Sequence, residues 1–344
     1  MVLYSVLSAL LLFQGVPKTE FTKSQYRVSG DPMWRNIGIQ FDGTFLVNDP
    51  EKGVVHFRDN GNIINSFRLG GNLDVDVAGT AIWDGHHYII NDSLNLNSRI
   101  FNSSCQYMNL SPNYSNQLFY LDGMLFMPDI IKLIQKYKML SPRERQSITA
   151  EPILTGLVIN EDGYRIETPF LPFCSLNDFS QIPVTSEVFS YVTNIFPFIV
   201  NENIGVIGAI GNKCLFYNHG GQLQRQIALG RPGNFEDIKS TDYLKSAQYI
   251  VDNKSIIYDA FSYQNLIYYV YTSKEVGPVE LVKTLWLAYF DMNGNLLGFT
   301  NLPEKEPYIG SKDGIYYTLK WDSVDDRYFI NSYPLPTANP YGSK

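Results

Sequence analysis

The residues with the most potential for chemistry are acidic side chains that end short apolar runs. Asp49 follows the run FLVN, Asp92 follows YIIN, and Glu202 follows FIVN. Carboxylate and side-chain amide oxygens are the ligands that hard cations such as calcium prefer. If the three runs converge on one channel, Asp49, Asp92 and Glu202 form a candidate calcium site.

A second candidate site combines aromatic and charged residues in predicted loops. Its members are Trp34, Asp49, Asp92, Arg231 and Trp321. Aromatic rings beside acids and a guanidinium suit the binding of a protein, a peptide or a glycan. The competing interpretation is that the loop acids are simply solvated and that the two tryptophans belong to the core. Both interpretations stay open.

Motifs with a fixed catalytic spacing are missing from the sequence. There is no GxSxG, no HExxH, no phosphate-binding GKS or GKT loop and no EF-hand loop. His86 and His87 are adjacent on a predicted strand and so point to opposite faces, while the other two histidines are isolated. Three cysteines without CxxC spacing indicate buried thiols. These features argue against zinc or iron catalysis.

Composition limits the class of partner. The chain has 344 residues with 27 Lys and Arg against 34 Asp and Glu, a net charge of −7, which argues against nucleic acid. Apolar residues make up 44% and aromatic residues 14%, enough to fill a core. This composition excludes intrinsic disorder.

Repeated turn dipeptides predict the elements that would position these residues. Asp-Gly, Asn-Gly and Gly-Gly pairs stand between short apolar runs, and such pairs supply the positive φ of tight hairpins. They occur at residues 42–43, 60–61, 84–85, 122–123, 162–163, 220–221, 293–294 and 313–314. The pattern predicts antiparallel strands grouped into six units.

Six such units predict an all-β, six-bladed β-propeller of four-stranded antiparallel blades, in one domain over residues 18–344. The last unit has only three strands, and we expect residues 21–30 to supply the fourth and close the ring. A seven-bladed ring remains an alternative if residues 247–263 form an additional hairpin.

Two segments resemble NHL repeats. The first is FDGTFLVNDPEKGVVHFRDNGNIINSFRLGG at residues 41–71, and the second is the Gly-rich linker ALGRPGNFEDI at residues 228–238. The resemblance covers about two units well and the others in outline. It implies six-bladed architecture rather than a particular activity.

One insertion interrupts the hairpins, at residues 129–147. Apolar residues there recur at helical spacing while lysines take the other face, which predicts an amphipathic helix. We expect this helix to cap the propeller rim; a projecting helix that meets a partner is the alternative.

The N-terminus carries a compartment signal. Residues 2–13 read VLYSVLSALLLF, too short for a bilayer, which needs about 20 residues, but typical of a secretory signal. We therefore expect a signal peptide over residues 1–17 and a secreted or periplasmic protein. No basic residue precedes the run, so the alternative is a buried element of a cytoplasmic protein.

Two functional hypotheses follow. The first is a non-catalytic, exported, monomeric propeller that binds a protein, peptide or glycan and needs no cofactor. The second is a calcium-dependent, lactonase-like hydrolase whose metal, held in the central channel, would polarise a substrate carbonyl.

Overall fold

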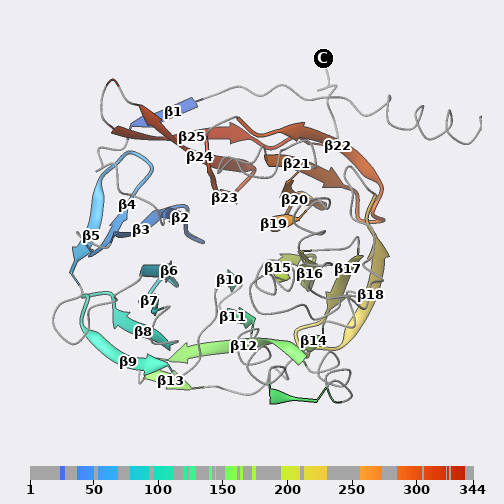
Figure 1. The fold of residues 1–344 in the computed structure, drawn as a ribbon, viewed down its shortest axis with the longest axis horizontal. Helices are drawn as coiled ribbons and strands as arrows, with labels where there is room; N and C mark the ends of the chain where they lie inside the picture. Colours follow the sequence, from blue (N-terminus) through green and yellow to red (C-terminus); the bar gives the residue numbers. More distant parts are fainter. Residues whose placement is uncertain are drawn as a thin grey trace, which may run out of the picture.

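The structure of the chain is a computed structural model, which describes part of the sequence. The described residues are 24–27, 37–49, 53–68, 78–92, 97–111, 119–121, 124–128, 139–141, 144, 152–160, 163–165, 173–175, 195–209, 213–230, 256–272, 285–303, 306–322, 324 and 327–337. They form 25 strands, which are arranged as a ring of sheets (Figure 1). Of the predicted helix at 129–147, only Met139–Ser141 and Glu144 lie within these ranges, with Met139 helical.

The first two blades are meanders in which each strand pairs with the next. Blade β2–β5 consists of β2 (Ile37–Ile39), β3 (Phe45–Asp49), β4 (Gly53–Phe57) and β5 (Ile63–Phe67). Blade β6–β9 consists of β6 (Ala78–Trp83), β7 (His87–Asp92), β8 (Asn97–Asn102) and β9 (Tyr107–Ser111). The apolar runs form the second strands of these blades. A second strand lies in the middle of its sheet, and the neighbouring blades cover both faces of that sheet, so its side chains are buried on both sides.

The next sheet departs from the predicted four strands. It contains β10 (Phe119–Leu121), β11 (Met124–Pro128), β12 (Pro152–Asn160), β13 (Gly163–Arg165) and β14 (Phe173–Ser175). With nine residues, β12 is long enough to pair with β11, β13 and β14 at different points along its length. We call this five-stranded unit sheet β10–β14.

Two further four-stranded blades follow. Blade β15–β18 consists of β15 (Ile195–Val200), β16 (Asn203–Gly208), β17 (Lys213–Tyr217) and β18 (Leu223–Ala228). Blade β19–β22 consists of β19 (Ile257–Tyr263), β20 (Leu266–Thr272), β21 (Leu285–Phe290) and β22 (Leu296–Asn301). Residues 257–263 of the segment proposed for an additional hairpin are thus the first strand of this blade, and residues 247–255 lie outside the described residues.

The closing blade joins the two ends of the described chain. It contains β23 (Tyr308–Lys312), β24 (Ile315–Asp322), β25 (Arg327–Pro334) and β1 (Ser24–Arg27). β1 pairs antiparallel with the middle of β25, from Phe329 to Ser332. The expected fourth strand from residues 21–30 is therefore confirmed. The pairing covers an edge that would otherwise offer free backbone groups.

The sheets follow one another around the ring in chain order. β3 contacts β6, β9 contacts β13, β10 contacts β15, β15 contacts β19, and β23 returns to contact β2. The first strand of each unit lies nearest the centre (Figure 1).

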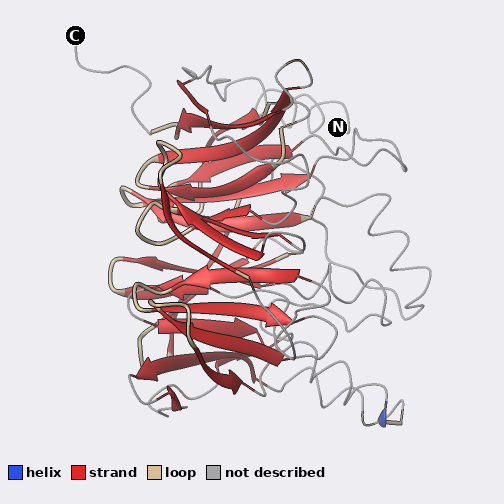
Figure 2. Cartoon of the chain, turned by 90° about the vertical axis from the view of Figure 1, so that its left-hand side faces the viewer, coloured by secondary structure: helices blue, strands red, loops and turns tan. Residues whose placement is uncertain are grey.

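Short turns gather on one face of the ring, which we call the turn face (Figure 2). In four blades the turn after the third strand has one shared geometry, in which the first residue's amide donates to the fifth residue's carbonyl at 3.0–3.1 Å. The fourth residue has positive φ in each: Gly61, Cys105, Gly221 and Gly294. This repeat explains why the Asn-Gly and Gly-Gly pairs recur at those positions.

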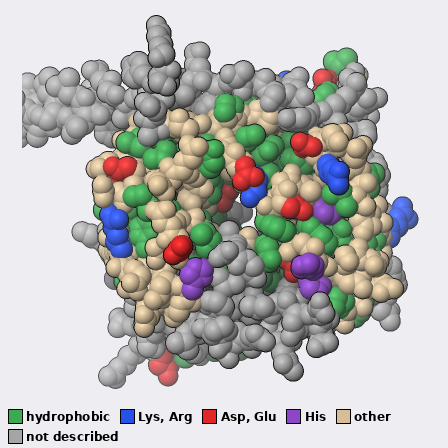
Figure 3. Space-filling view, turned by 180° about the vertical axis from the view of Figure 1, so that it is seen from behind, with side chains coloured by type: hydrophobic (Ala, Val, Ile, Leu, Met, Phe, Trp, Pro, Cys, Tyr) green, Lys and Arg blue, Asp and Glu red, His purple; other side chains and the backbone are tan. Residues whose placement is uncertain are grey.

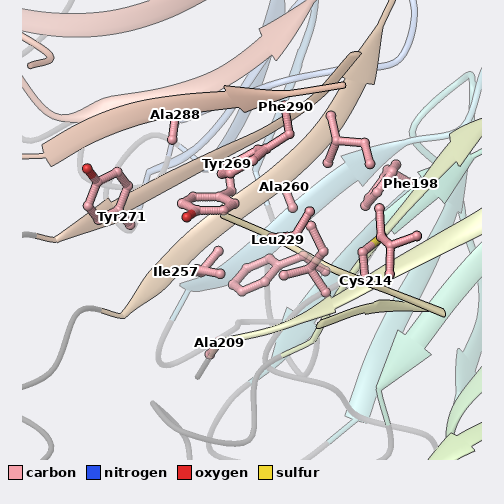
Figure 4. Close-up of a cluster of buried hydrophobic side chains, with 14 of the residues drawn as sticks. Phe198, Ala209, Cys214, Leu229, Ile257, Ala260, Tyr269, Tyr271, Ala288 and Phe290 are labelled. Atoms are coloured by element: carbon pink, nitrogen blue, oxygen red, sulfur yellow. The ribbon is translucent and has the colours of Figure 1, made fainter. Parts of the chain in front are cut away.

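The core lies between blades. Figure 4 shows the largest junction, between blades β15–β18 and β19–β22, where Phe198 and Cys214 meet Tyr269 and Phe290. All four side chains are at most 4% exposed. Smaller clusters fill three other junctions, so the blades on either side of them are held by packing against each other.

Candidate functional site

The innermost strands β2, β6, β10, β15, β19 and β23 surround the centre of the ring (Figure 1). Figure 3 shows a hollow near the middle of the turn face, with acidic and basic side chains at its border. Ligand sites of proteins are generally concave, so the polar residues near the axis are the first to consider.

The structure brings two of the predicted calcium ligands to the same rim of the ring, at the end of the strands opposite the turn face. Asp49 ends β3 opposite Gly53, and Asp92 ends β7 opposite Asn97. Both therefore stand where the second strand of a blade passes to the third, in neighbouring blades. Asp322 ends β24 at the corresponding place, and its Oδ1 accepts the amide of Val324 at 2.9 Å.

The other predicted site residues are not gathered there. Glu202 lies exposed in the turn between β15 and β16, at the opposite end of the strands from Asp49 and Asp92. Trp321 lies in β24 opposite Tyr328. Trp34 and Arg231 are outside the described residues. Across the described ranges, no three His, Cys, Asp or Glu side chains are close enough together to hold a metal ion.

A cluster that the sequence did not indicate lies between the innermost strands of the last two blades. The hydroxyl of Tyr308 on β23 donates to Asp259 Oδ2 on β19 at 2.5 Å. The same hydroxyl shares a hydrogen bond of 2.8 Å with Ser311 Oγ. Asp259 Oδ1 accepts the amide of Ala260 at 2.9 Å. A β-bulge between Ile257 and Asp259 shifts the register at this point.

The environment of Asp259 changes its acidity. Burial raises the pKa of Asp259 to about 6, although the hydrogen bonds from Tyr308 and the Ala260 amide act in the opposite direction. The pKa of Tyr308 is also raised, by burial first and then by the neighbouring carboxylate. This carboxyl therefore exchanges its proton nearer to neutral pH than an ordinary aspartate does.

A second carboxylate is buried in the same junction. Glu306, just before β23, is 9% exposed, and its Oε2 accepts three hydrogen bonds. The donors are Thr318 Oγ1 at 2.7 Å, Asn331 Nδ2 at 2.8 Å and Tyr333 OH at 2.9 Å. Such a set of donors replaces the water that the carboxylate loses on burial.

A different polar chain crosses the junction between the first two blades. Thr44 Oγ1 donates to Asp42 Oδ1 at 2.5 Å and lies 2.6 Å from His56 Nε2. His56 Nδ1 lies 3.0 Å from the hydroxyl of Tyr88 in the next blade. His56 is 1% exposed, and burial lowers its pKa although Asp42 acts in the opposite direction.

The positions of the protons decide whether the hydrogen-bonded series Asp42–Thr44–His56–Tyr88 could activate a nucleophile. When the only proton of the Thr44 hydroxyl is donated to Asp42, the fitting tautomer of His56 has its hydrogen on Nε2 and donates to Thr44. Nδ1 is then the acceptor for Tyr88. A general base would have to take the hydroxyl proton instead. A hydroxyl, an imidazole and a carboxylate are present together. In this arrangement of protons the hydroxyl donates to the carboxylate rather than to the imidazole, so the series connects two blades and does not activate a nucleophile.

The turn between β6 and β7 is also stabilised by hydrogen bonds of polar side chains. Asp84 Oδ1 accepts the amides of His86 and His87 at 2.8 and 2.6 Å, and Asp84 Oδ2 is 3.0 Å from His87 Nδ1. Gln40 reaches across the junction to accept the amide of Trp83 at 2.8 Å. These groups stabilise turns and the contact between blades.

Taken with the ring of antiparallel meanders, these junctions define the class: the chain is a β-propeller with four-stranded antiparallel blades. No family model matches the sequence, and no curated protein matches it. The solved structures that match this chain include two from Bacteroides species. A member of the DUF4221 family from Bacteroides vulgatus ATCC 8482 has a TM-score of 0.63 at 12% identity, covering 92% of this chain and 97% of that chain.

The second structure is a candidate exported protein from Bacteroides fragilis NCTC 9343. It has a TM-score of 0.57 at 12% identity and covers 94% of this chain and 97% of that chain. At this identity the likeness establishes the fold alone. Among the described residues, none of the helical segments has the length and hydropathy needed to cross a bilayer.

Proposed function

We propose that the chain is an exported, non-catalytic propeller that binds a protein, peptide or glycan. The observation that carries this proposal is the geometry of the hydrogen-bonded series Asp42–Thr44–His56–Tyr88, in which the Thr44 hydroxyl lies 2.5 Å from a carboxylate oxygen and the imidazole is 1% exposed. A hydrolase would need such groups open to substrate. Here they stabilise a scaffold, which is what a binding module requires.

We propose that the five-stranded sheet β10–β14 is also a blade, which makes the ring six-bladed. The shared geometry of four turns supports a repeat of the NHL type, since the sequence resemblance falls on one of those turns, at residues 58–62. Export is supported by the candidate exported protein that shares the fold. Mass spectrometry of the protein from the exported fraction tests it, with loss of residues 1–17 as the expected result.

Ligand contact is proposed at the rim where second strands end, with Asp49, Asp92 and Trp321. Trp34 and Arg231 are proposed as ligand-binding residues from the sequence alone, since they lie outside the described residues. Glycan and peptide arrays probed with the full chain test this directly. The double variant Asp49→Asn/Asp92→Asn should lose the signal, whereas Asp59→Asn, in an exposed turn on the other face, should keep it. An equal signal from both variants would remove the rim from the proposal.

The second candidate function is the calcium-dependent, lactonase-like hydrolase. It is favoured by one observation: Asp49 and Asp92 end equivalent strands in neighbouring blades, each preceded by an asparagine. Thermal melts in calcium and in EDTA, with elemental analysis, separate the two functions. A site at a hundredfold excess over its Kd adds about 2.7 kcal/mol. Stoichiometric metal and a higher melting temperature would favour the hydrolase; no metal and no shift would favour the binding module.

A further inference from the structure

The cluster Asp259–Tyr308–Ser311 has properties that its role in joining two blades does not require. All three residues are partly buried on innermost strands, β19 and β23. Ser311 Oγ has Tyr308 as its side-chain partner and no other within the described part of the chain. One end of this hydrogen-bonded series is therefore a carboxyl group. The other end is the Ser311 hydroxyl, which can form a further hydrogen bond.

Two arrangements of protons satisfy the same three groups. When Asp259 is ionised, Tyr308 must donate to it, and Ser311 then donates to Tyr308. When Asp259 is protonated, its own O–H can donate to Tyr308, which in turn donates to Ser311. The 2.5 and 2.8 Å distances fit both arrangements, because either oxygen of each pair can be the donor once Asp259 carries a proton.

We propose that Asp259, Tyr308 and Ser311 form a proton-responsive relay between the innermost strands β19 and β23, in which a proton taken up from solvent at Asp259 reverses both hydrogen bonds. In the ionised state the free capacity of Ser311 is that of an acceptor. In the protonated state Ser311 has a free donor. A group that approaches Ser311 therefore meets an acceptor at higher pH and a donor at lower pH.

The described elements around Asp259 carry few other ionisable groups. The described residues of β15 are apolar, and β20 carries Tyr268, Tyr269 and Tyr271, the pKa of each of which is raised by burial. From the closing blade, Glu306 is held by Thr318, Asn331 and Tyr333, and Lys312 pairs with Asp313 at 3.2 Å. Burial raises the pKa of Asp259 to about 6, within the range where such a relay would respond.

The test follows the side-chain carboxyl carbon of Asp259 by NMR as the pH of the full chain is changed. Aspartate is labelled with 13C, and the signal is assigned as the one lost in Asp259→Asn. We expect a midpoint near pH 6. Tyr308→Phe should move the midpoint upward, because a donor to the ionised form is lost. Ser311→Ala should move it upward by less.

One expected result distinguishes the three-residue relay from a simple Asp259–Tyr308 pair. Ser311 acts on Asp259 only through the Tyr308 hydroxyl, so Ser311→Ala should leave the midpoint unchanged when Tyr308→Phe is already present. An equal effect of Ser311→Ala in both backgrounds would overturn the relay. So would an Asp259 signal that titrates near pH 4 in the wild type. Both readings are taken on folded protein, and Ser311→Ala removes a single oxygen atom.

Discussion

Two blade junctions bury polar groups with opposite charge behaviour. The junction between blades β2–β5 and β6–β9 holds a histidine, His56, whose pKa is lowered by burial and whose ring nitrogens lie near two hydroxyl groups. The junction between blade β19–β22 and the closing blade holds two carboxyl groups, Asp259 and Glu306, surrounded by hydroxyl and amide donors. We call these the histidine junction and the carboxyl junction.

The difference makes the two junctions respond to acid in opposite directions. Burial lowers the pKa of His56, so its contribution to stability is fully present above its ordinary value of 6.5 and is lost as the pH falls below it. Burial raises the pKa of Asp259 from 3.8 to about 6, so its contribution is present at low pH and is lost as the pH rises through 6. Acid therefore lowers the contribution of the histidine junction to stability and raises the contribution of the carboxyl junction.

The largest expected effect breaks the carboxyl junction. Glu306→Ala leaves the donors Thr318, Asn331 and Tyr333 without their shared acceptor, each buried. Unpaired buried donors cost about 1–3 kcal/mol each, so we expect a loss of about 3–5 kcal/mol in urea unfolding at pH 7. Glu202→Ala, at an exposed turn, is the control and should leave the midpoint unchanged. A small loss from Glu306→Ala would mean that water replaces the carboxylate.

The next effect breaks the histidine junction. His56→Ala removes both hydrogen bonds and leaves a cavity against Trp83 and Tyr88, whose rings lie 5.3 and 5.6 Å from the imidazole. We expect a loss of about 2–4 kcal/mol in the same unfolding assay. His219→Ala, in the turn after β17, should have no measurable effect. If the two histidine variants lose equally, the junction is not what His56 stabilises.

A third prediction sharpens the comparison by pH. Wild-type stability should contain a decline between about pH 4 and 6 that comes from Asp259, and Asp259→Asn should remove it. Two pH units correspond to about 3 kcal/mol at most, since one unit is about 1.36 kcal/mol. The amide oxygen of the variant can still accept from Tyr308. Unfolding free energies measured from pH 4 to 8 check this: the two curves should converge at pH 4 and separate above pH 6, with Asp259→Asn the higher. Parallel curves across the whole range would show that Asp259 does not carry the dependence.

Turns and strands were predictable because their signals are local. The pairs at Asp42-Gly43, Asp84-Gly85 and Asp313-Gly314 connect first and second strands with glycine at positive φ. The closing strand followed from counting strands. Antiparallel four-stranded blades could therefore be predicted from spacing alone.

The polar junctions could not be predicted, because their partners are far apart in sequence. Asp259 and Tyr308 are 49 residues apart, and His56 and Tyr88 are 32 apart. Their contact depends on how twisted sheets pack around the ring, which a hydrophobic pattern does not specify. The one available signal was an acid inside an apolar strand, SIIYDAFSY, where a solvated carboxylate would not be expected. The five-stranded sheet was missed for the same reason, since β14 pairs with β12 through tertiary contact.

The smallest effect tests the proton order assigned to the histidine junction. Thr44→Val replaces the hydroxyl that donates to Asp42 and accepts from His56, and we expect a loss of about 1 kcal/mol because the Asp42 end remains solvated. Thr44→Ser keeps the hydroxyl and should unfold like the wild type. The discriminating measurement is the 15N shift of His56 in an HSQC optimised for imidazole rings: protonation at Nε2 in the wild type supports a donor to Thr44. Protonation at Nδ1 would reverse the chain, give the Thr44 hydroxyl an imidazole acceptor, and reopen the catalytic interpretation of this junction.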